Sequence, residues 1–232
     1  MYKRQYQYLI YKEYLEHSPF EKLQVHLRQE RLLPRTIDNY TLSRIFSAAY
    51  SDLRESQSNN HYFVSMRDVA VLELLFATGV RVSELCSITC ENLNLQNQVV
   101  LIKGKGSKER CIYISSPPVI SALASYSALR TTIDSPDPYF FLNRDKHRLS
   151  EQSVRRIICR YTPTDAAHYT PHMFRHSFAT YLWEQCGNIY EVKEILGHSS
   201  VKTTERYVHA SFEQQKRILT TMHPRNTLKI EF

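Results

Sequence analysis

Apolar residues recur at helical spacing along most of this chain, and the pattern predicts where its helices lie. Segment 38–54 repeats apolar positions with the period of a helix that buries one face. Residues 55–62 are polar and predict a loop. Ser65 and Asp68 have the spacing of a capping box before a long apolar run, and Gly79 is placed to end that helix.

The same reasoning predicts further helices and one small sheet. β-rich runs at 99–102 and 110–114 flank a glycine-containing turn, which is typical of a hairpin, and 93–95 can add a third strand. Further helices are expected at 82–88, 117–129, 150–161, 170–186 and 188–196, from 200, and at 211–222. The predicted fold class is therefore α+β, mainly α-helical, with a small three-stranded antiparallel sheet.

The first residues are organised differently from the rest. Residues 2–16 suit a short helix with no evident packing partner, and Ser18-Pro19-Phe20 breaks it. Residues 21–36 are charged and irregular. We therefore divide the chain into 1–17, a linker at 18–36, and a main domain with a tail helix at 37–232.

Composition narrows the function classes. The 232 residues carry 30 Lys and Arg against 23 Asp and Glu, a formal net charge of +7, which favours a polyanionic partner. No run is long and apolar enough to span a membrane, and no secretory signal is visible. The five cysteines are odd in number and form no C-x-x-C pair. They predict reduced, mostly buried thiols and exclude a disulfide framework or a zinc site.

Five side chains together have the chemistry needed to hold and attack a phosphate diester. Arginine forks can neutralise the non-bridging oxygens, imidazoles can move protons near neutral pH, and a phenol can become a covalent nucleophile. Each residue alone is weak evidence, but the set lies at glycine- and proline-marked helix boundaries. The five are Arg81 in A-T-G-V-R-V-S-E-L, His172 and Arg175 in T-P-H-M-F-R-H, His198 in L-G-H-S-S and Tyr207 in T-T-E-R-Y-V-H.

The same segments argue against metal chemistry. His172 and His176 are four residues apart, but the segment lacks the glutamate of H-E-x-x-H, and Arg175 would repel a cation. Acidic residues do not cluster near the motifs, which disfavours a two-metal nuclease. No metal site is therefore predicted.

These motifs, with G-K-G-S-K-E-R at 104–110, resemble in order and spacing those of the tyrosine recombinases, or phage-type integrases, most closely the Xer-type enzymes. The likeness runs from about residue 18 to residue 225 and includes His223-Pro224-Arg225 near the end. It implies the tyrosine-recombinase catalytic-domain fold. It also implies a site-specific recombinase that cleaves and rejoins DNA through a 3′-phosphotyrosyl intermediate, with no cofactor.

The resemblance implies a role for each of the five residues. Tyr207 would attack the scissile phosphorus. Arg81 and Arg175 would hold the non-bridging oxygens as charge rearranges in the pentacoordinate state. His198 would add a hydrogen bond to the same phosphoryl group, and His172 would accept the tyrosine proton or help to place it.

The basic residues around these motifs have less specific signals. Lys105, on the hairpin turn, would protonate the leaving 5′-oxygen, and the alternative is a basic strap that only binds phosphates. Glu84 is expected to be structural and to orient Arg81. DNA contacts are expected from Lys103, Lys108, Arg110, Arg155, Arg156, Arg160 and Lys202.

Members of the family usually carry an N-terminal helical domain of roughly a hundred residues, so residues 1–17 resemble the remnant of a truncated core-binding domain. The expected partners are double-stranded DNA and further copies of the chain, as a tetramer on paired sites joined through the tail. No membrane is expected, and the location would be the bacterial cytoplasm, at the nucleoid. The alternatives are a type IB topoisomerase-like enzyme that relaxes DNA and a non-catalytic DNA-binding remnant of an integrase. The tail helix favours the recombinase.

Overall fold

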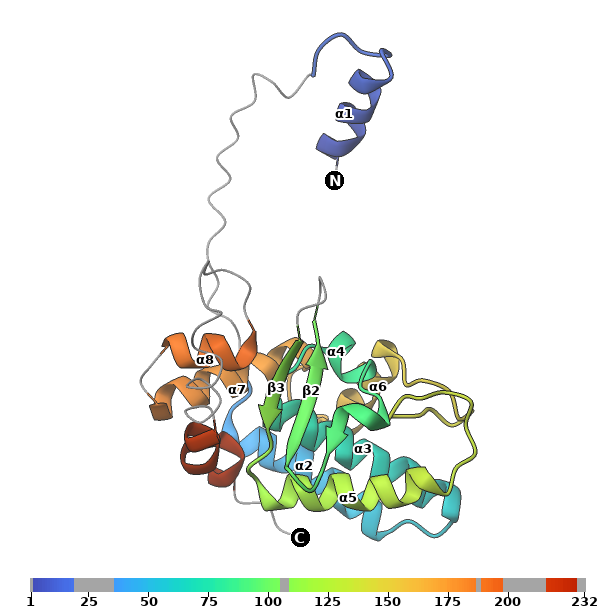
Figure 1. Ribbon diagram of the computed structural model, residues 1–232, viewed down its shortest axis with the longest axis vertical. Helices are drawn as coiled ribbons and strands as arrows, with labels where there is room; N and C mark the ends of the chain where they lie inside the picture. Colours follow the sequence, from blue (N-terminus) through green and yellow to red (C-terminus); the bar gives the residue numbers. More distant parts are fainter. Residues whose placement is uncertain (1, 19–35, 105–108, 187–188, 198–215, 229–232) are drawn as a thin grey trace. The chain divides into compact units, whose positions relative to one another are not determined.

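The computed structural model describes residues 2–18, 36–104, 109–186, 189–197 and 216–228. The chain divides into two compact units, Met1–Leu33 and Pro34–Phe232, and each is described by itself. The first unit contains helix α1 (Tyr2–Tyr11), which has neither an acidic residue in its first turn nor a basic one in its last. All remaining elements belong to the second unit (Figure 1).

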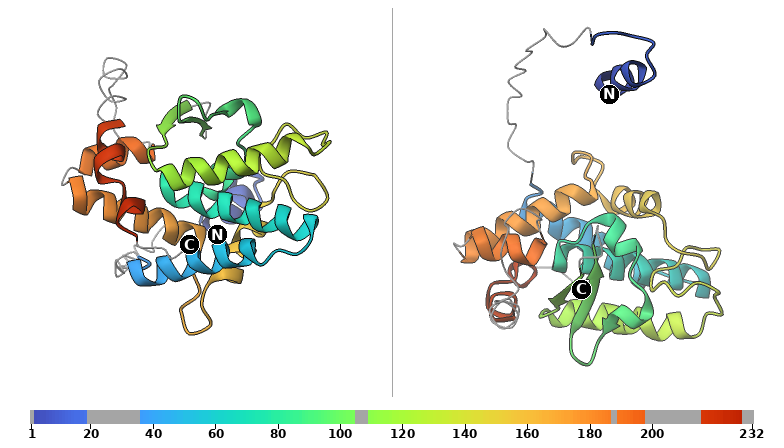
Figure 2. Two further views of the ribbon diagram at one scale, coloured as in Figure 1. Left: turned by 90° about the horizontal axis from the view of Figure 1, so that it is seen from below. Right: turned by 45° about the horizontal axis from the view of Figure 1, so that its top comes forward.

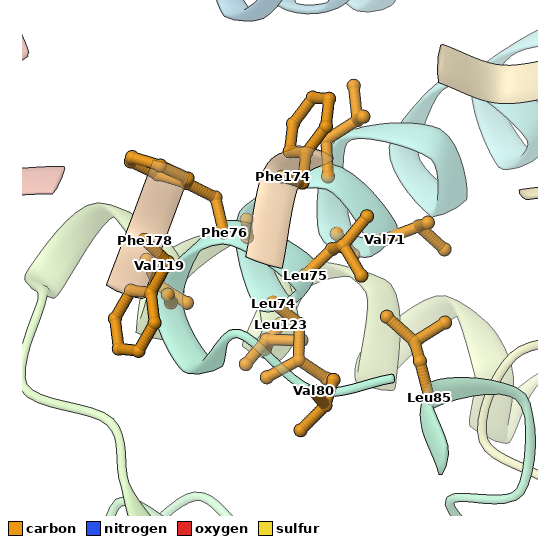
Figure 3. Packing of buried hydrophobic residues seen from close by; sticks show 14 of the residues in the cluster. Val71, Leu74, Leu75, Phe76, Val80, Leu85, Val119, Leu123, Phe174 and Phe178 are labelled. Carbon is orange, nitrogen blue, oxygen red and sulfur yellow. The ribbon is translucent and has the colours of Figure 1, made fainter. Parts of the chain in front are cut away.

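Helix α3 (Asn59–Thr78) is the central element of the second unit. It packs against α2 (Asn39–Arg54), α5 (Pro117–Thr131) and α7 (Pro171–Cys186), and Figure 2 shows it running between α2 and α5. Every residue from Val64 to Thr78 is buried, because neighbours cover the helix on all sides. Figure 3 shows the contact with α5 and α7 at Leu74, Leu75, Phe76, Val119, Leu123, Phe174 and Phe178.

The start of α3 differs from the prediction. The helix begins at Asn59 inside the expected loop, and the side chain of Ser58 caps it by accepting a bond from the His61 N–H at 3.2 Å. Ser65 and Asp68 are therefore not a capping box. Both lie in the helix interior, where the Ser65 hydroxyl donates to Asp52 and the Asp68 carboxylate accepts from arginines. Two of these partners, Asp52 and Arg160, belong to other helices, so the spacing of Ser65 and Asp68 alone suggested a helix start.

The end of α3 agrees with the prediction. Gly79 follows the helix with φ +58°, a left-handed conformation that glycine adopts without strain, and its N–H donates to the Leu75 carbonyl. A Cβ at this position would also collide with the Phe178 ring. Short helix α4 (Val82–Cys86) begins three residues later, with Arg81 at its N-cap.

A three-stranded antiparallel sheet forms the next part of the unit, as predicted. Its order is β1 (Leu93–Asn94), β2 (Val99–Lys103) and β3 (Glu109–Tyr113). Alternate residues such as Val100, Ile102 and Ile112 are buried, which gives the sheet one core-facing side. Ile102 of β2 pairs with Arg110 of β3, one pair before the segment that connects the two strands.

The other expected helices are present where the structure describes them. They are α6 (Glu151–Tyr161), capped by Ser150, and α8 (Ile189–Leu196), with 3₁₀ segments η1 (Cys90–Asn92) and η2 (Pro224–Thr227). The helix expected from residue 200 lies outside the described residues. Among the helices that are described, none combines the length and apolarity of a membrane span.

The described part of the tail packs on the chain's own core. Residues 216–222 are helical, Leu219 is fully buried, and the Ser115 hydroxyl donates to its carbonyl. His223 accepts a backbone bond from Arg225 through Nδ1 and faces the Ala77 carbonyl through Nε2 at 2.7 Å, so Nε2 carries the proton.

Arg225 then makes a forked ion pair with Glu73 of α3, at 2.8 and 2.9 Å, and both side chains are buried. The Tyr50 hydroxyl donates to the same carboxylate at 2.8 Å. The buried glutamate is thus matched by a guanidinium from a segment about 150 residues away, which fixes the tail to the central helix.

The prediction for the cysteines was wrong in one respect. Of the four cysteines whose side chains the structure describes, Cys86 is buried, whereas Cys90, Cys111 and Cys159 are exposed, and all four are free thiols. On β3 and α6 the exposed thiols occupy the polar face, which a small side chain can share at little cost.

The buried His223 predicts an acid-sensitive term in stability. Burial lowers its pKa from the ordinary 6.5 to about 4, so below pH 6.5 the unfolded chain binds a proton that the folded chain refuses. Stability from this group is full above pH 6.5 and is lost as pH falls to about 4, by roughly 3 kcal/mol.

His223→Gln can still donate to the Ala77 carbonyl but does not titrate. Both proteins are unfolded in urea at pH values from 7.5 to 4.5. Over this range the free energy of unfolding of the native protein should fall, relative to that of His223→Gln, by most of the roughly 3 kcal/mol. A difference that stays constant with pH would contradict the assignment.

Candidate active site

Arg81 is held at the start of α4 by the carboxylate of Glu84. The Arg81 backbone N–H donates to Glu84 Oε2 at 2.8 Å, and its guanidinium donates to Oε1 at 2.9 Å. The Arg81 side chain is 46% exposed, whereas that of Glu84 is only 5% exposed. The bond to Glu84 therefore fixes the base of the arginine fork and leaves its outer edge open to solvent.

Arg175 comes from a different element, α7, and its side chain reaches the turn that carries Arg81. It lies in the second turn of α7, 5% exposed, and donates to the Gly79 carbonyl at 2.6 Å and to the Leu196 carbonyl at 2.9 Å. These carbonyls lie two residues before Arg81 and two residues before His198. A guanidinium has five N–H donors, so three remain for another acceptor.

The charges of these residues influence one another. Burial lowers the pKa of Arg175 to about 10, repulsion from Arg81 and Arg110 adds to this effect, and Glu84 opposes it. Burial alone would raise the pKa of Glu84, but hydrogen bonds from Arg110 and from the Arg81 N–H outweigh it and bring the pKa down to about 2. At neutral pH the group has three guanidiniums and one carboxylate, an excess of positive charge suited to an anion.

His172 lies exposed at the start of α7 and faces His176 one turn later. Their Nε2 atoms are 3.1 Å apart and the rings meet edge to face. Burial, then the charges of His172 and Arg175, lowers the pKa of His176, which favours its neutral form. Within the residues that the structure describes, no three His, Cys, Asp or Glu side chains form a metal-binding group.

The hairpin residues divide by exposure. Lys103 is 60% exposed and lies 4.0 Å from Glu109, a weak pair at the surface. Arg110 differs from the expected outward contact. Its side chain is 17% exposed and its guanidinium donates to both oxygens of Glu84, at 3.2 and 2.8 Å.

The arginines predicted on α6 also differ from one another. Arg156 is exposed, and Arg155 is exposed with a 3.3 Å pair to Glu151. Arg160 is partly exposed, but its guanidinium donates at 2.8 Å to the fully buried Asp68. Arg160 thus has a structural partner that its place on the polar face of the predicted helix did not indicate.

Several predicted site residues lie outside the described residues. They are Lys105, Lys108, His198, Lys202 and Tyr207. Of the five residues first singled out, the structure brings Arg175 to the turn that carries Arg81, through the Gly79 carbonyl, with His172 on the helix of Arg175. Sequence spacing did not reveal that Arg110 shares Glu84 with Arg81. The sequence offered one signal for this contact. The alternation of β3 puts Arg110 on the core-facing side of the strand.

This arrangement can bind one tetrahedral anion. The outer edge of Arg81 and the three remaining donors of Arg175 come from separate elements and supply forked hydrogen bonds to non-bridging oxygens. His172 adds an exposed imidazole on the same helix, able to take or give a proton near neutral pH.

Comparison with known proteins identifies the relatives of this chain. The sequence profile of the phage integrase family matches residues 50–214. A tyrosine recombinase of Agathobacter rectalis is 40% identical over 222 residues, which cover 95% of this chain and 72% of the relative. The tyrosine recombinase XerC of Bacillus subtilis is 33% identical over 227 residues, covering 95% and 71%.

A solved structure shares the fold. The XerH site-specific recombinase, bound to a palindromic difH substrate in a post-cleavage complex, superposes with a TM-score of 0.60 at 25% identity. The match covers 84% of this chain and 52% of the XerH chain, so this chain spans about half of that protein. The likeness confirms the mainly helical fold with its small antiparallel sheet.

The charge arrangement predicts a cost for removing the shared carboxylate. Glu84→Gln should lower the free energy of unfolding on the order of 2 kcal/mol at pH 7, because two guanidiniums lose their counter-charge. The matched control is Asp165→Asn, which breaks a forked pair with Arg44 at 2.9 Å on the open surface and should leave the free energy of unfolding nearly unchanged. Equal losses in urea unfolding would contradict a special role for the buried carboxylate.

Proposed function

Since this chain belongs to the phage integrase family and is a tyrosine recombinase, an enzyme that breaks and rejoins DNA, we propose that its reaction runs through Tyr207 and the arginines gathered around Glu84. The support that matters most is the bond from Arg175 to the Gly79 carbonyl, which brings its guanidinium to the turn that carries Arg81. Two guanidiniums from separate elements match the two non-bridging oxygens of one phosphodiester.

In the first step the Tyr207 oxygen bonds to the scissile phosphorus while the bond from phosphorus to the 5′-oxygen breaks. His172 takes the phenol proton, and Lys105 gives a proton to the departing 5′-oxygen. Arg81, Arg175 and His198 stabilise the charge of the pentacoordinate state. The phosphotyrosyl ester keeps the bond energy, and a 5′-hydroxyl reverses the step to rejoin a strand.

The partner of the site is double-stranded DNA. A solved relative, XerH, is bound to its difH substrate in a post-cleavage complex, which supports the same partner here. The exposed basic side chains Lys103, Arg155 and Arg156 would contact the phosphate backbone, together with Lys108 and Lys202. We further propose that four copies assemble on paired sites through the C-terminal tail, at the bacterial nucleoid.

Loss of the nucleophile oxygen should abolish the covalent intermediate. Tyr207→Phe should form no protein–DNA adduct with a nicked duplex library of randomised core sequence, because no other group is placed to become an ester. Adducts are counted on denaturing gels. The control is Tyr62→Phe, an exposed tyrosine of α3, which should react as the native protein does. Adduct formation by Tyr207→Phe at the native level would contradict the assignment.

A second measurement separates recombination from simple relaxation. A recombinase should exchange segments between two copies of a selected site, whereas a topoisomerase-like enzyme would relax a supercoiled plasmid that has no such site. We expect exchange that depends on both sites and increases steeply with protein concentration. Relaxation of site-free plasmid at the same rate, without exchange, would favour the topoisomerase alternative.

A further inference from the structure

Arg110 is mostly covered and turned toward Glu84, whereas a contact with the DNA backbone would need its charged end in solvent. It is the second residue of β3 and lies opposite Ile102, a core residue of β2. Its side chain is 17% exposed, and both terminal nitrogens donate to Glu84. A side chain that reaches for phosphate from a hairpin would point its charged end into solvent, as the 60% exposed Lys103 does.

The carboxylate that Arg110 binds is also the one that fixes Arg81. Glu84 accepts from the backbone N–H and the guanidinium of Arg81, and from two nitrogens of Arg110. The two arginines therefore share one buried acceptor. Movement of Arg110 changes the orientation of the carboxylate, and the carboxylate sets the direction of the Arg81 fork.

Arg110 also packs against the turn that precedes His198. A Cβ on Gly197 would lie 3.0 Å from both Cδ and one terminal nitrogen of Arg110, and Gly197 has φ +64°. The arginine stem thus occupies the space that a side chain at residue 197 would need. The turn at 196–197 is the one that receives Arg175, through the Leu196 carbonyl.

Stability alone does not account for this placement. Nε of Arg110 is buried and has no hydrogen-bond partner within the part of the chain that the structure describes, and an unpaired buried donor costs stability. An apolar side chain at this strand position would avoid that cost. The Arg110 guanidinium instead lies between the Arg81 turn and the Gly197 turn. It keeps these two segments, which position Arg81 and Arg175, at a fixed separation.

We propose that Arg110 is a positioning residue for strand cleavage, which acts on the scissile phosphate through Glu84 and Arg81. This inference rests on the proposed function. A small displacement of the Arg81 guanidinium weakens its binding to the transition state far more than it weakens the binding of the DNA substrate. The predicted signature is a loss of rate with little loss of affinity.

The test compares Arg110→Gln with the native protein on the nicked duplex selected above. At saturating DNA, the single-turnover rate of adduct formation should fall about 100-fold, and the dissociation constant should change less than about threefold. Arg110→Lys keeps the charge but loses the forked hydrogen bonds. Its rate should lie between those of the native protein and Arg110→Gln. The control Arg44→Gln removes a forked pair with Asp165 at the surface and should keep the native rate.

The opposite result has a distinct form. If Arg110 contacts the DNA backbone, Arg110→Gln will weaken binding, reduce the salt dependence by about one phosphate contact, and keep the native rate at saturation. That result overturns the proposal. A rate loss that only matches the loss of folded protein, measured by circular dichroism, overturns it as well.

Two further readouts distinguish action through Arg81 from a general packing defect. In a double-mutant cycle, Glu84→Gln and Arg110→Gln should be strongly non-additive, because both changes disturb one unit, and additive losses overturn the proposal. A neutral methylphosphonate at the scissile position needs less charge neutralisation. With this substrate the difference in cleavage rate between the native protein and Arg110→Gln should therefore become smaller. An unchanged defect counts against the proposal. If the native protein forms no adduct, the proposed function itself fails.

Discussion

A single buried carboxylate makes the arrangement of like charges around it possible. Arg81, Arg110 and Arg175 repel one another, and without a counter-charge they would separate or lose protons. Glu84 accepts from two of them and lies in a helix of five residues whose start is fixed by the left-handed Gly79. The fold thus holds three guanidiniums around one carboxylate. The negative charge of a bound phosphate can neutralise the positive charge that remains.

Local pattern predicted most of the secondary structure, for reasons visible in particular residues. Gly79 as a helix end, the hairpin around Gly104 and the Ser150 cap are all set by nearby chain. The start of α3 was not predicted, because the polar residues Asn59, Asn60 and His61 resemble a loop. Tertiary packing of the following apolar turns extends the helix through them, with Ser58 as the cap.

The candidate site was predictable in its members and less so in its contacts. Arg81 and Arg175 carry motif signals, but the bonds of Arg175 to the carbonyls of Gly79 and Leu196 depend on how α7 packs on α3 and α8. The burial of Arg110 and the ion pair of Arg160 with Asp68 link residues 26 and 92 positions apart. Spacing rules describe one element at a time, so bonds of that kind lie beyond their reach.

The pairing of Arg225 with Glu73 makes the end of the chain part of its centre. Without that guanidinium, the Glu73 carboxylate would remain buried in α3, and among the described residues only the Tyr50 hydroxyl would bond to it. The stability of the helix that leads into the Arg81 turn therefore depends on a segment about 150 residues further along the chain. A change at Arg225, far from the catalytic arginines in sequence, would loosen the central helix that positions them.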